Sequence, residues 1–214
     1  MKFKINKSFN TSVDRSSRVL ECAEAFGLGL EEKKFTLYDD LELEVRPGDM
    51  VYITGQSGSG KSQLLYELWK QDEIQKLNPR SIETVEMKEM PLIDQVGKST
   101  TEAINILSAA GLNDAYLFIR KPSELSDGQR YRFRIALLMA SGSSVWFADE
   151  FGAVLDRVTA KAVAINLRRQ AQRAKATVVV ATTHKDLKDE LAPNLYIDKS
   201  YKAKVLVEYK DKED

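Results

Sequence analysis

The chain has 214 residues, of which 43% are hydrophobic, so it can bury the core of one large domain or two small ones. Its 32 basic and 32 acidic residues cancel, which removes any overall charge argument for binding nucleic acid or an anionic membrane. We expect a cytoplasmic protein in a reducing compartment, because Cys22 is the only cysteine, the N-terminus lacks a signal peptide, and no stretch approaches ~20 apolar residues.

The first half of the chain predicts a small sheet followed by a strand and several helices. Residues 2–6 and 35–45 alternate polar and apolar side chains, which favours an antiparallel sheet. A turn at 46–49 leads into a buried strand over 49–54 and then a helix over 61–70. Further elements are predicted in this order: a strand over 81–86, a mostly helical region over 100–118 broken at Gly111, and a helix capped by Ser126 that runs to about 139.

The second half alternates strands with helices. Residues 144–149 and 177–183 read as buried strands, with a helix over 157–174 between them, and a short helix over 185–191 precedes two terminal strands. This alternation predicts an α/β domain with a largely parallel sheet. The helical stretch at 100–140 is either a layer of the same fold or an inserted subdomain. We expect the charged tail at 210–214 to be flexible.

One glycine-rich segment between a predicted strand and a predicted helix indicates phosphate binding. Its residues follow the spacing G-x-x-x-x-G-K-S: Gly55, Gln56, Ser57, Gly58, Ser59, Gly60, Lys61 and Ser62. The glycines let successive N–H groups point into one concavity at a helix N-terminus, where phosphate oxygens bind. In this P-loop, Lys61 reaches the β- and γ-phosphates and the Ser62 hydroxyl ligates Mg²⁺.

Two carboxylates follow the predicted strand at 144–149. In parallel α/β sheets, ligands bind outside the carboxyl ends of the strands, so this strand end should lie beside the P-loop. We assign Asp149 to Mg²⁺, directly or through water, and Glu150 to the attacking water as general base.

A third segment makes the prediction more specific. Residues 125–129 read Leu-Ser-Asp-Gly-Gln, which resembles the L-S-G-G-Q signature of the ATP-binding-cassette (ABC) ATPases. The difference is Asp127, which stands where the third position is usually glycine. Ser126 and the Gly128 N–H begin a predicted helix, whose N-terminus favours an anion. The signature set is Ser126, Asp127, Gly128 and Gln129.

The resemblance implies a dimer and further site residues. Two copies of such ATPases sandwich two ATP molecules head-to-tail, with Ser126 and Gly128 of one copy meeting the γ-phosphate held by the other. His184 resembles the switch histidine that contacts the γ-phosphate and the attacking water, and Asp156 resembles the D-loop aspartate that crosses the dimer interface. Our candidate for the Q-loop glutamine, which senses Mg²⁺ and water, is Gln95.

The resemblance also implies an aromatic side chain upstream of the P-loop that stacks on the adenine. Phe26 and Phe35 are both candidates for this position, and either could instead be a core residue.

We therefore expect one ABC-type ATPase domain over 1–214, with a P-loop NTPase (RecA-like) core, an N-terminal antiparallel β subdomain and a short helical subdomain at about 97–140. It should hydrolyse Mg-ATP as a homodimer to drive a partner, in a soluble, non-transport role like that of small soluble ABC-type ATPases, some of which are fused to acetyltransferase-like domains. Two alternatives stay open. One is the ATP-binding subunit of a transporter with separate membrane chains, and the other is a regulatory module with little turnover.

The hypothesis of a nucleic-acid partner rests on one observation. After Arg157, the helix predicted over 157–174 and the residue that follows it carry five further cations with no acidic residue between them: Lys161, Arg168, Arg169, Arg173 and Lys175. This row is either a solvated helix face or a patch that contacts phosphates.

Overall fold

Two sheets form the framework of the computed structural model, which describes residues 1–200 and 204–210. The smaller sheet is an antiparallel pair, β1 (Lys2–Thr11) and β2 (Lys33–Glu44). The larger has six strands in the order β4-β5-β6-β3-β7-β8. Its bounds are β3 Met50–Gly55, β4 Arg80–Ser81, β5 Val145–Ala148, β6 Thr177–Thr182, β7 Leu195–Lys199 and β8 Val205–Tyr209. All of its neighbouring strands pair in parallel except β7 and β8, so the predicted largely parallel α/β sheet is confirmed.

The central strands are apolar on both faces because helices or strands cover each face. Every residue of β3, β5 and β6 is buried. Successive side chains point to opposite faces of a strand. Accordingly, Met50 and Tyr52 of β3 join one core, whereas Val51 and Ile53 join the other. Such continuous apolar runs are typical of strands that are buried on both sides.

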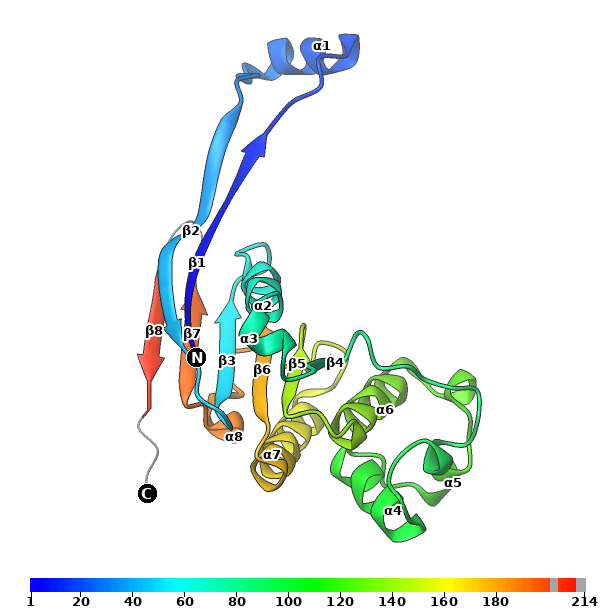
Figure 1. Cartoon of the computed structure of the whole chain (residues 1–214). Helices are drawn as coiled ribbons and strands as arrows, with labels where there is room; N and C mark the ends of the chain where they lie inside the picture. Colours follow the sequence, from blue (N-terminus) through cyan, green and yellow to red (C-terminus); the bar gives the residue numbers. More distant parts are fainter. Residues whose placement is uncertain (201–203, 211–214) are drawn as a thin grey trace.

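Different elements cover the two faces of the large sheet (Figure 1). One face carries α2 (Lys61–Trp69), α3 (Asp72–Gln75) and the lower half of the β1–β2 hairpin, which contributes Phe3, Ile5 and Leu43 to that core. The opposite face carries α7 (Arg157–Ala174) and α8 (Lys188–Leu191).

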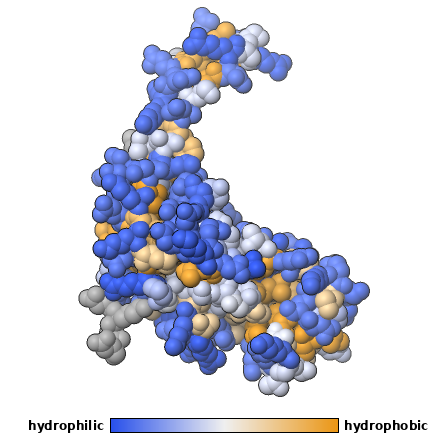
Figure 2. Space-filling model, in the orientation of Figure 1, coloured by the Kyte–Doolittle hydropathy of each residue, from blue (hydrophilic) through white to orange (hydrophobic). Residues whose placement is uncertain are grey.

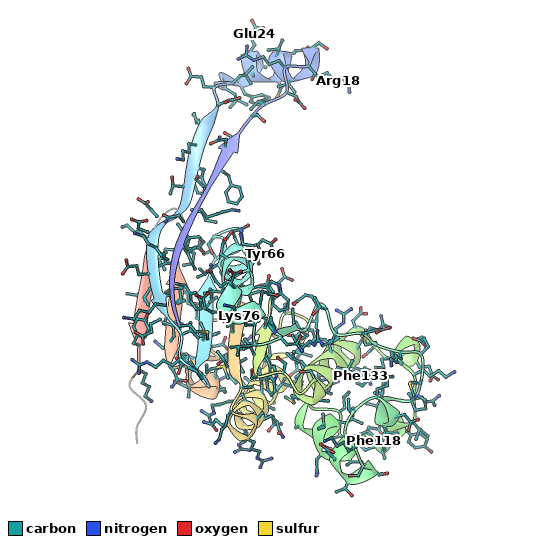
Figure 3. The ribbon with its side chains drawn as sticks, in the orientation of Figure 1. Arg18, Glu24, Tyr66, Lys76, Phe118 and Phe133 are labelled. Carbon is teal, nitrogen blue, oxygen red and sulfur yellow. The ribbon has the colours of Figure 1, made fainter. Side chains whose placement is uncertain are left out.

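The helices between β4 and β5 form a lobe beside the β4 edge of the sheet (Figure 1). We call residues 97–140 the helical lobe. The bounds of its elements, with the short helix that precedes them, are η1 Leu92–Asp94, α4 Thr100–Ala109, α5 Ala115–Phe118, η2 Pro122–Glu124 and α6 Asp127–Ala140. The side chains of Phe118 and Phe133, labelled in Figure 3, join the same core as buried residues of α7, so the lobe packs directly on the sheet layer.

The β1–β2 hairpin continues past the sheet as a long arm with a helix at its tip (Figure 1). This helix, α1 (Ser17–Phe26), begins where the Ser16 hydroxyl accepts the N–H of Val19 and ends at Gly27 with φ of 60°. An N-cap serine and a left-handed C-cap glycine are common helix boundaries, so the sequence held a signal for α1 that our prediction missed.

Two predicted elements are shorter than expected. Only Arg80–Ser81 pairs as a strand, because the N–H groups of Thr84 and Val85 turn back to the Ser81 carbonyl instead of extending along β5. The helix expected over 185–191 starts at Lys188. In the expected flexible tail, the Lys210 N–H donates to the Asn194 carbonyl at 2.8 Å. Residues 211–214 lie outside the described residues. No helix of the described ranges is long and apolar enough to span a bilayer.

Trp146 anchors the core that joins the sheet to the helical lobe. Its side chain is fully buried on β5, and its indole N–H donates to the Ser143 carbonyl at 2.8 Å. We expect Trp146→Ala to lower the free energy of unfolding by about 3–5 kcal/mol, measured by urea denaturation followed by circular dichroism. Trp69 is only partly buried, so Trp69→Ala is the matched control and should lower the free energy of unfolding by less. Equal losses for the two variants would contradict this account.

Candidate functional site

The P-loop backbone requires glycine where neighbouring elements approach it most closely. Gly55 ends β3 with φ of 145°, and a Cβ there would lie 2.1 Å from the backbone oxygen of Lys199. Gly60 has φ of 103°, and a Cβ there would lie 2.7 Å from the Leu37 side chain. Larger residues at these positions would push the loop away from β7 and β2. The strand, loop and helix predicted around residues 55–62 are confirmed.

The first turn of α2 is open to an anion. Gly60 is its N-cap and supplies no side-chain hydrogen bond, so the N-terminal N–H groups of the helix remain available. The ammonium of Lys61 donates to the Gln56 carbonyl at 2.8 Å, which holds it over the loop. Burial is the main cause that keeps the pKa of Lys61 below its ordinary value, while the Asp149 and Glu150 carboxylates act in the opposite direction.

A cavity of about 350 Å³ brings the P-loop together with the ends of β5 and β6. Its lining residues are Ser57, Gly58, Gly60, Lys61, Ser62, Asp149, Glu150, Ala153, Thr182 and Thr183. The buried hydroxyl of Ser59 beside them has no partner within the described chain. Open helix N–H groups, a cation and an unpaired hydroxyl fit a phosphate chain. The carboxylates that line the same cavity as Ser62 fit a divalent cation.

Asp149 and Glu150 follow β5, and a local hydrogen bond and an unusual backbone angle fix their conformation. The Asp149 carboxylate accepts the N–H of Glu150 at 2.8 Å. Glu150 has φ of 44°, in the left-handed region that non-glycine residues rarely occupy. Strained residues of this kind cluster at active sites, where the surrounding structure holds a side chain in a required direction. This geometry is compatible with the predicted role of Glu150.

Glu83 lies beside these carboxylates, and the sequence analysis did not identify it. One of its carboxylate oxygens accepts the N–H of Asp149 at 3.1 Å, and the other is hydrogen-bonded to the Ser81 hydroxyl. Burial raises the pKa of Glu83, and the neighbouring Asp149 carboxylate raises it further. Glu83 lies just after β4, at the edge where the strand ends of a parallel sheet meet, but the strand predicted over 81–86 placed it inside a strand.

Tyr38 is a second residue that the sequence analysis did not identify. It is buried on β2, and its hydroxyl donates to the Gly60 carbonyl at 2.9 Å. Burial raises the pKa of Tyr38, so the phenol stays protonated and remains a donor. Since Leu37 also contacts Gly60, the hairpin holds the last turn of the P-loop in place.

The Tyr38 hydrogen bond can be tested alone, because Tyr38→Phe removes only the hydroxyl. A hydrogen bond contributes about 0.5–1.5 kcal/mol, so we expect the Kd for ATP to rise about two- to tenfold. Titration with a fluorescent ATP analogue measures this change. Tyr66→Phe, on the exposed side of α2 (Figure 3), is the matched control and should leave the Kd unchanged. A Tyr38→Phe protein with lower stability but unaltered affinity would contradict the positioning role.

The signature residues lie outside the P-loop cavity of their own chain. The Ser126 hydroxyl accepts the N–H of Gln129, and the Gln129 side chain accepts the N–H of Ser126, so the two cap α6 reciprocally. Asp127 is 92% exposed and its nearest cation is Arg130 at 3.8 Å. A carboxylate that points into solvent leaves the Ser126 and Gly128 positions accessible to another molecule.

Asp156 caps α7 and lies on the same surface as the signature. Its carboxylate accepts the Thr159 N–H at 3.0 Å and the Thr159 hydroxyl at 2.5 Å. Gly128 approaches the Val154 carbonyl, so the segment that leads to Asp156 packs against the signature. The structure thus gives Asp156 a capping role, and its dimer-interface role stays a prediction.

His184 and Gln95 are not among the residues that line the cavity. The backbone of His184 is held just beyond Thr183, since its N–H donates to the Thr182 hydroxyl at 3.2 Å and its carbonyl accepts from Tyr52. The Gln95 amide instead closes its own loop, with bonds of 2.7–2.8 Å to the backbone of Lys88 and Met90. Glu83, and not Gln95, lies next to Asp149.

The two aromatic candidates for adenine stacking lie at different places. Phe26 is the last residue of α1, at the far end of the arm from the P-loop (Figure 1), which does not fit stacking on a base bound there. Phe35 lies on β2 three residues before Tyr38 and is partly exposed, so it is the better placed of the two.

Comparisons with known proteins agree with this arrangement. The sequence profile described as ABC transporter matches residues 38–153. The macrolide export ATP-binding/permease protein MacB of Neisseria meningitidis serogroup B is 30% identical over 76% of this chain, which spans only 30% of that protein's length. The lipoprotein-releasing system ATP-binding protein LolD of Xanthomonas campestris is 30% identical over 81% of this chain and 87% of its own length.

A solved structure supports the fold. The dimeric post-hydrolysis state of the ATP-binding cassette MJ0796 with ADP and Pi superimposes with a TM-score of 0.66 at 18% identity, over 98% of both chains. The profile match covers more than half of the chain and includes the P-loop, the signature and both strand-end carboxylates. On these grounds the chain belongs to the ABC transporter family and is an ABC-type ATPase.

Proposed function

We propose that this ATPase is the ATP-hydrolysing subunit of a transporter whose membrane-spanning part lies outside the described chain, and that it works on the cytoplasmic side as a head-to-tail homodimer. The observation that carries the proposal is the cavity that joins the P-loop to Asp149 and Glu150 in a chain similar to LolD over most of both lengths. This similarity favours the transporter alternative over the non-transport role that we preferred from the sequence.

In this proposal Lys61, Ser62, Asp149 and Glu150 divide the chemistry of the cavity. The α2 N-terminus and Lys61 bind the phosphates, and Ser62 with Asp149 holds Mg²⁺, which supplies charge neutralisation at the phosphate oxygens when bound. Within residues 1–200 and 204–210 no three acidic, histidine or cysteine side chains gather as a metal site, so Ser62 and Asp149 would hold the ion together with the bound nucleotide. Glu150 accepts the proton of the attacking water.

The signature acts across the dimer in this proposal. Ser126 and Gly128 lie outside their own cavity, at the exposed and reciprocally capped N-terminus of α6, and in this proposal they meet the γ-phosphate held by a second copy. His184, two residues after the cavity-lining Thr182, is proposed to reach the γ-phosphate once the copies close.

The transporter role is tested by affinity capture with the Glu150→Gln protein in Mg-ATP from detergent-solubilised membranes, with and without nuclease. We expect an integral membrane protein that nuclease does not release, and whose purified form stimulates ATP hydrolysis by the wild-type chain. The Lys61→Ala protein is the control and should lose the ATP-dependent part of the capture. Recovery only of nucleic acid, or of proteins that nuclease releases, would contradict the transporter role.

One observation supports a second candidate, a nucleic-acid-linked ATPase. Six cations lie on and just after α7, of which Arg157 pairs with Asp186 and Lys161 pairs with Glu190 at 2.9 Å. The other four, Arg168, Arg169, Arg173 and Lys175, form no ion pair within the described residues. If these four contacted phosphates, log K for duplex DNA would fall with log salt at a slope of roughly −3.6. If log K for DNA did not change with salt, the four cations would be a solvated helix face and not a phosphate-binding patch.

A further inference from the structure

The arm extends beyond the strand-end edge of the sheet, where the P-loop lies. Leu37 and Tyr38 contact Gly60, so the part of β2 that precedes them lies past the loop. Four further residues of β2 pair with the end of β1, from Thr36 with Ser8 to Lys33 with Thr11. At about 3.4 Å per residue this paired stem adds ~14 Å before α1 is reached. Figure 1 shows α1 clear of the rest of the chain.

A head-to-tail dimer places a second copy against this same edge. In the proposed dimer, Ser126 and Gly128 of the second copy lie over the first copy's P-loop. An arm that rises beside the P-loop must then run along the second copy. In that copy, α5 and η2 of the helical lobe lead directly into the signature that lies over the P-loop.

The arm tip and the lobe differ in net charge. The arm tip, residues 12–32, carries five carboxylates and two arginines, whereas the helical lobe carries six basic and four acidic residues. Within residues 114–124, the α5–η2 part of the lobe, the charges balance, and Arg120 pairs with Glu124 at 2.8 Å. None of the five carboxylates forms an ion pair within the described residues. Arg18 and Glu24, labelled in Figure 3, project from α1 into solvent. In the lobe, Lys121 stands just before η2 with no ion pair in the described chain.

Both surfaces also expose large apolar side chains. On the arm tip, Phe26 is 76% exposed and Leu20 is 45% exposed. On the lobe, Tyr116 is 70% exposed and Ile119 is 65% exposed. Figure 2 shows orange residues within the tip and over the lobe, each bordered by hydrophilic side chains. Exposed apolar groups bordered by charge are typical of protein interaction sites.

We propose that in the ATP-bound dimer α1 of each copy docks on the α5–η2 part of the helical lobe of the other copy. Phe26 and Leu20 then pack against Tyr116 and Ile119 of the second copy, and the arm-tip carboxylates lie near its Lys121. This contact rests on the proposed head-to-tail dimer. It adds an interface outside the ATP sandwich that strengthens the dimer without touching the nucleotide.

The single cysteine of the chain gives a direct test, because Cys22 lies exposed on α1. In the Glu150→Gln background with Mg-ATP, we add Lys121→Cys and treat the protein with a short bis-maleimide. A covalent dimer of twice the 24.2 kDa chain mass is expected with ATP and not with ADP. Arg169→Cys, on the exposed side of α7, and the chain with Cys22 alone are matched controls that should give no covalent dimer.

Light scattering on the same samples separates this contact from the dimer itself. If the copies associate in ATP but Cys22 does not cross-link to Lys121→Cys, the docking contact is wrong and the dimer stands. If the chain stays monomeric, both ideas fail.

A substitution test measures the energy of the contact. We expect Leu20→Asp combined with Phe26→Asp to raise the dimer Kd about tenfold or more, with the ATP affinity of the monomer unchanged. Leu206→Asp, at an exposed leucine on the edge strand β8, is the matched control. An unchanged dimer Kd overturns the proposal. If the double variant had an unchanged dimer Kd but its ATP hydrolysis was no longer stimulated by the membrane partner, the arm would instead contact that partner.

Discussion

Replacing Lys61 by alanine should lower kcat/KM for ATP hydrolysis by about 10²–10³-fold. The Lys61 ammonium is held over the P-loop by the Gln56 carbonyl and lies in the same cavity as Asp149 and Glu150. It is the only cation among the residues that line this cavity, and a donor aimed at developing phosphate charge in a dry site typically contributes this much. Phosphate release under saturating Mg-ATP measures the loss.

The control for this experiment is Lys76→Ala. Lys76 is an exposed lysine that follows α3, on the same layer as α2 but outside the cavity (Figure 3). We expect its activity to equal that of the wild type. If the Lys61→Ala protein hydrolysed ATP at the wild-type rate, the measured activity would come from a contaminant, and the chain would act as a nucleotide-gated module with little turnover.

Replacing Glu150 by glutamine should lower kcat by about 10²–10⁴-fold while ATP still binds. The amide keeps the size of the carboxylate but accepts a proton poorly, so the attacking water is no longer activated. Because hydrolysis is blocked after binding, the ATP-bound dimer should accumulate. Single-turnover kinetics with labelled ATP measures the chemical step, and light scattering measures the dimer.

Two comparisons make the Glu150 experiment decisive. Glu73→Gln, on the exposed side of α3, is the matched control and should keep wild-type turnover. Glu83→Gln tests the neighbouring carboxyl that accepts the Asp149 N–H. If Glu83→Gln stopped hydrolysis and Glu150→Gln did not, Glu83 would be the base. A Glu150→Gln protein that remained monomeric in saturating Mg-ATP would contradict the sandwich.

The parts of the fold that the sequence predicted well are those decided by neighbouring residues. The helix over 157–174 matches α7 residue for residue, because an Asp156 cap and a continuous run of helix-forming residues lie within one segment. The break at Gly111 and the Ser126 cap of α6 are local in the same way. The strand expected over 81–86 was wrong because its length depends on β5, more than sixty residues away.

The same distinction between local and long-range contacts holds for the candidate site. That Lys61, Ser62 and the carboxylates after β5 share one cavity could be predicted, since the P-loop is a contiguous motif and parallel strand ends share an edge. Gln95 was chosen on residue type alone, and its amide closes a loop instead of facing the cavity. Glu83 was missed because no spacing rule connects it to Asp149 until the sheet brings them together.

The sequence by itself determined that this chain binds phosphate and carries the parts of an ABC-type ATPase, because those motifs fold through local backbone geometry. Only the tertiary structure decided what surrounds them. It placed Tyr38 on Gly60 and Lys199 behind Gly55, and it extended the hairpin into an arm that ends in α1. Contacts between distant segments depend on how sheets and helices pack, and a pattern of neighbouring residues does not contain that information.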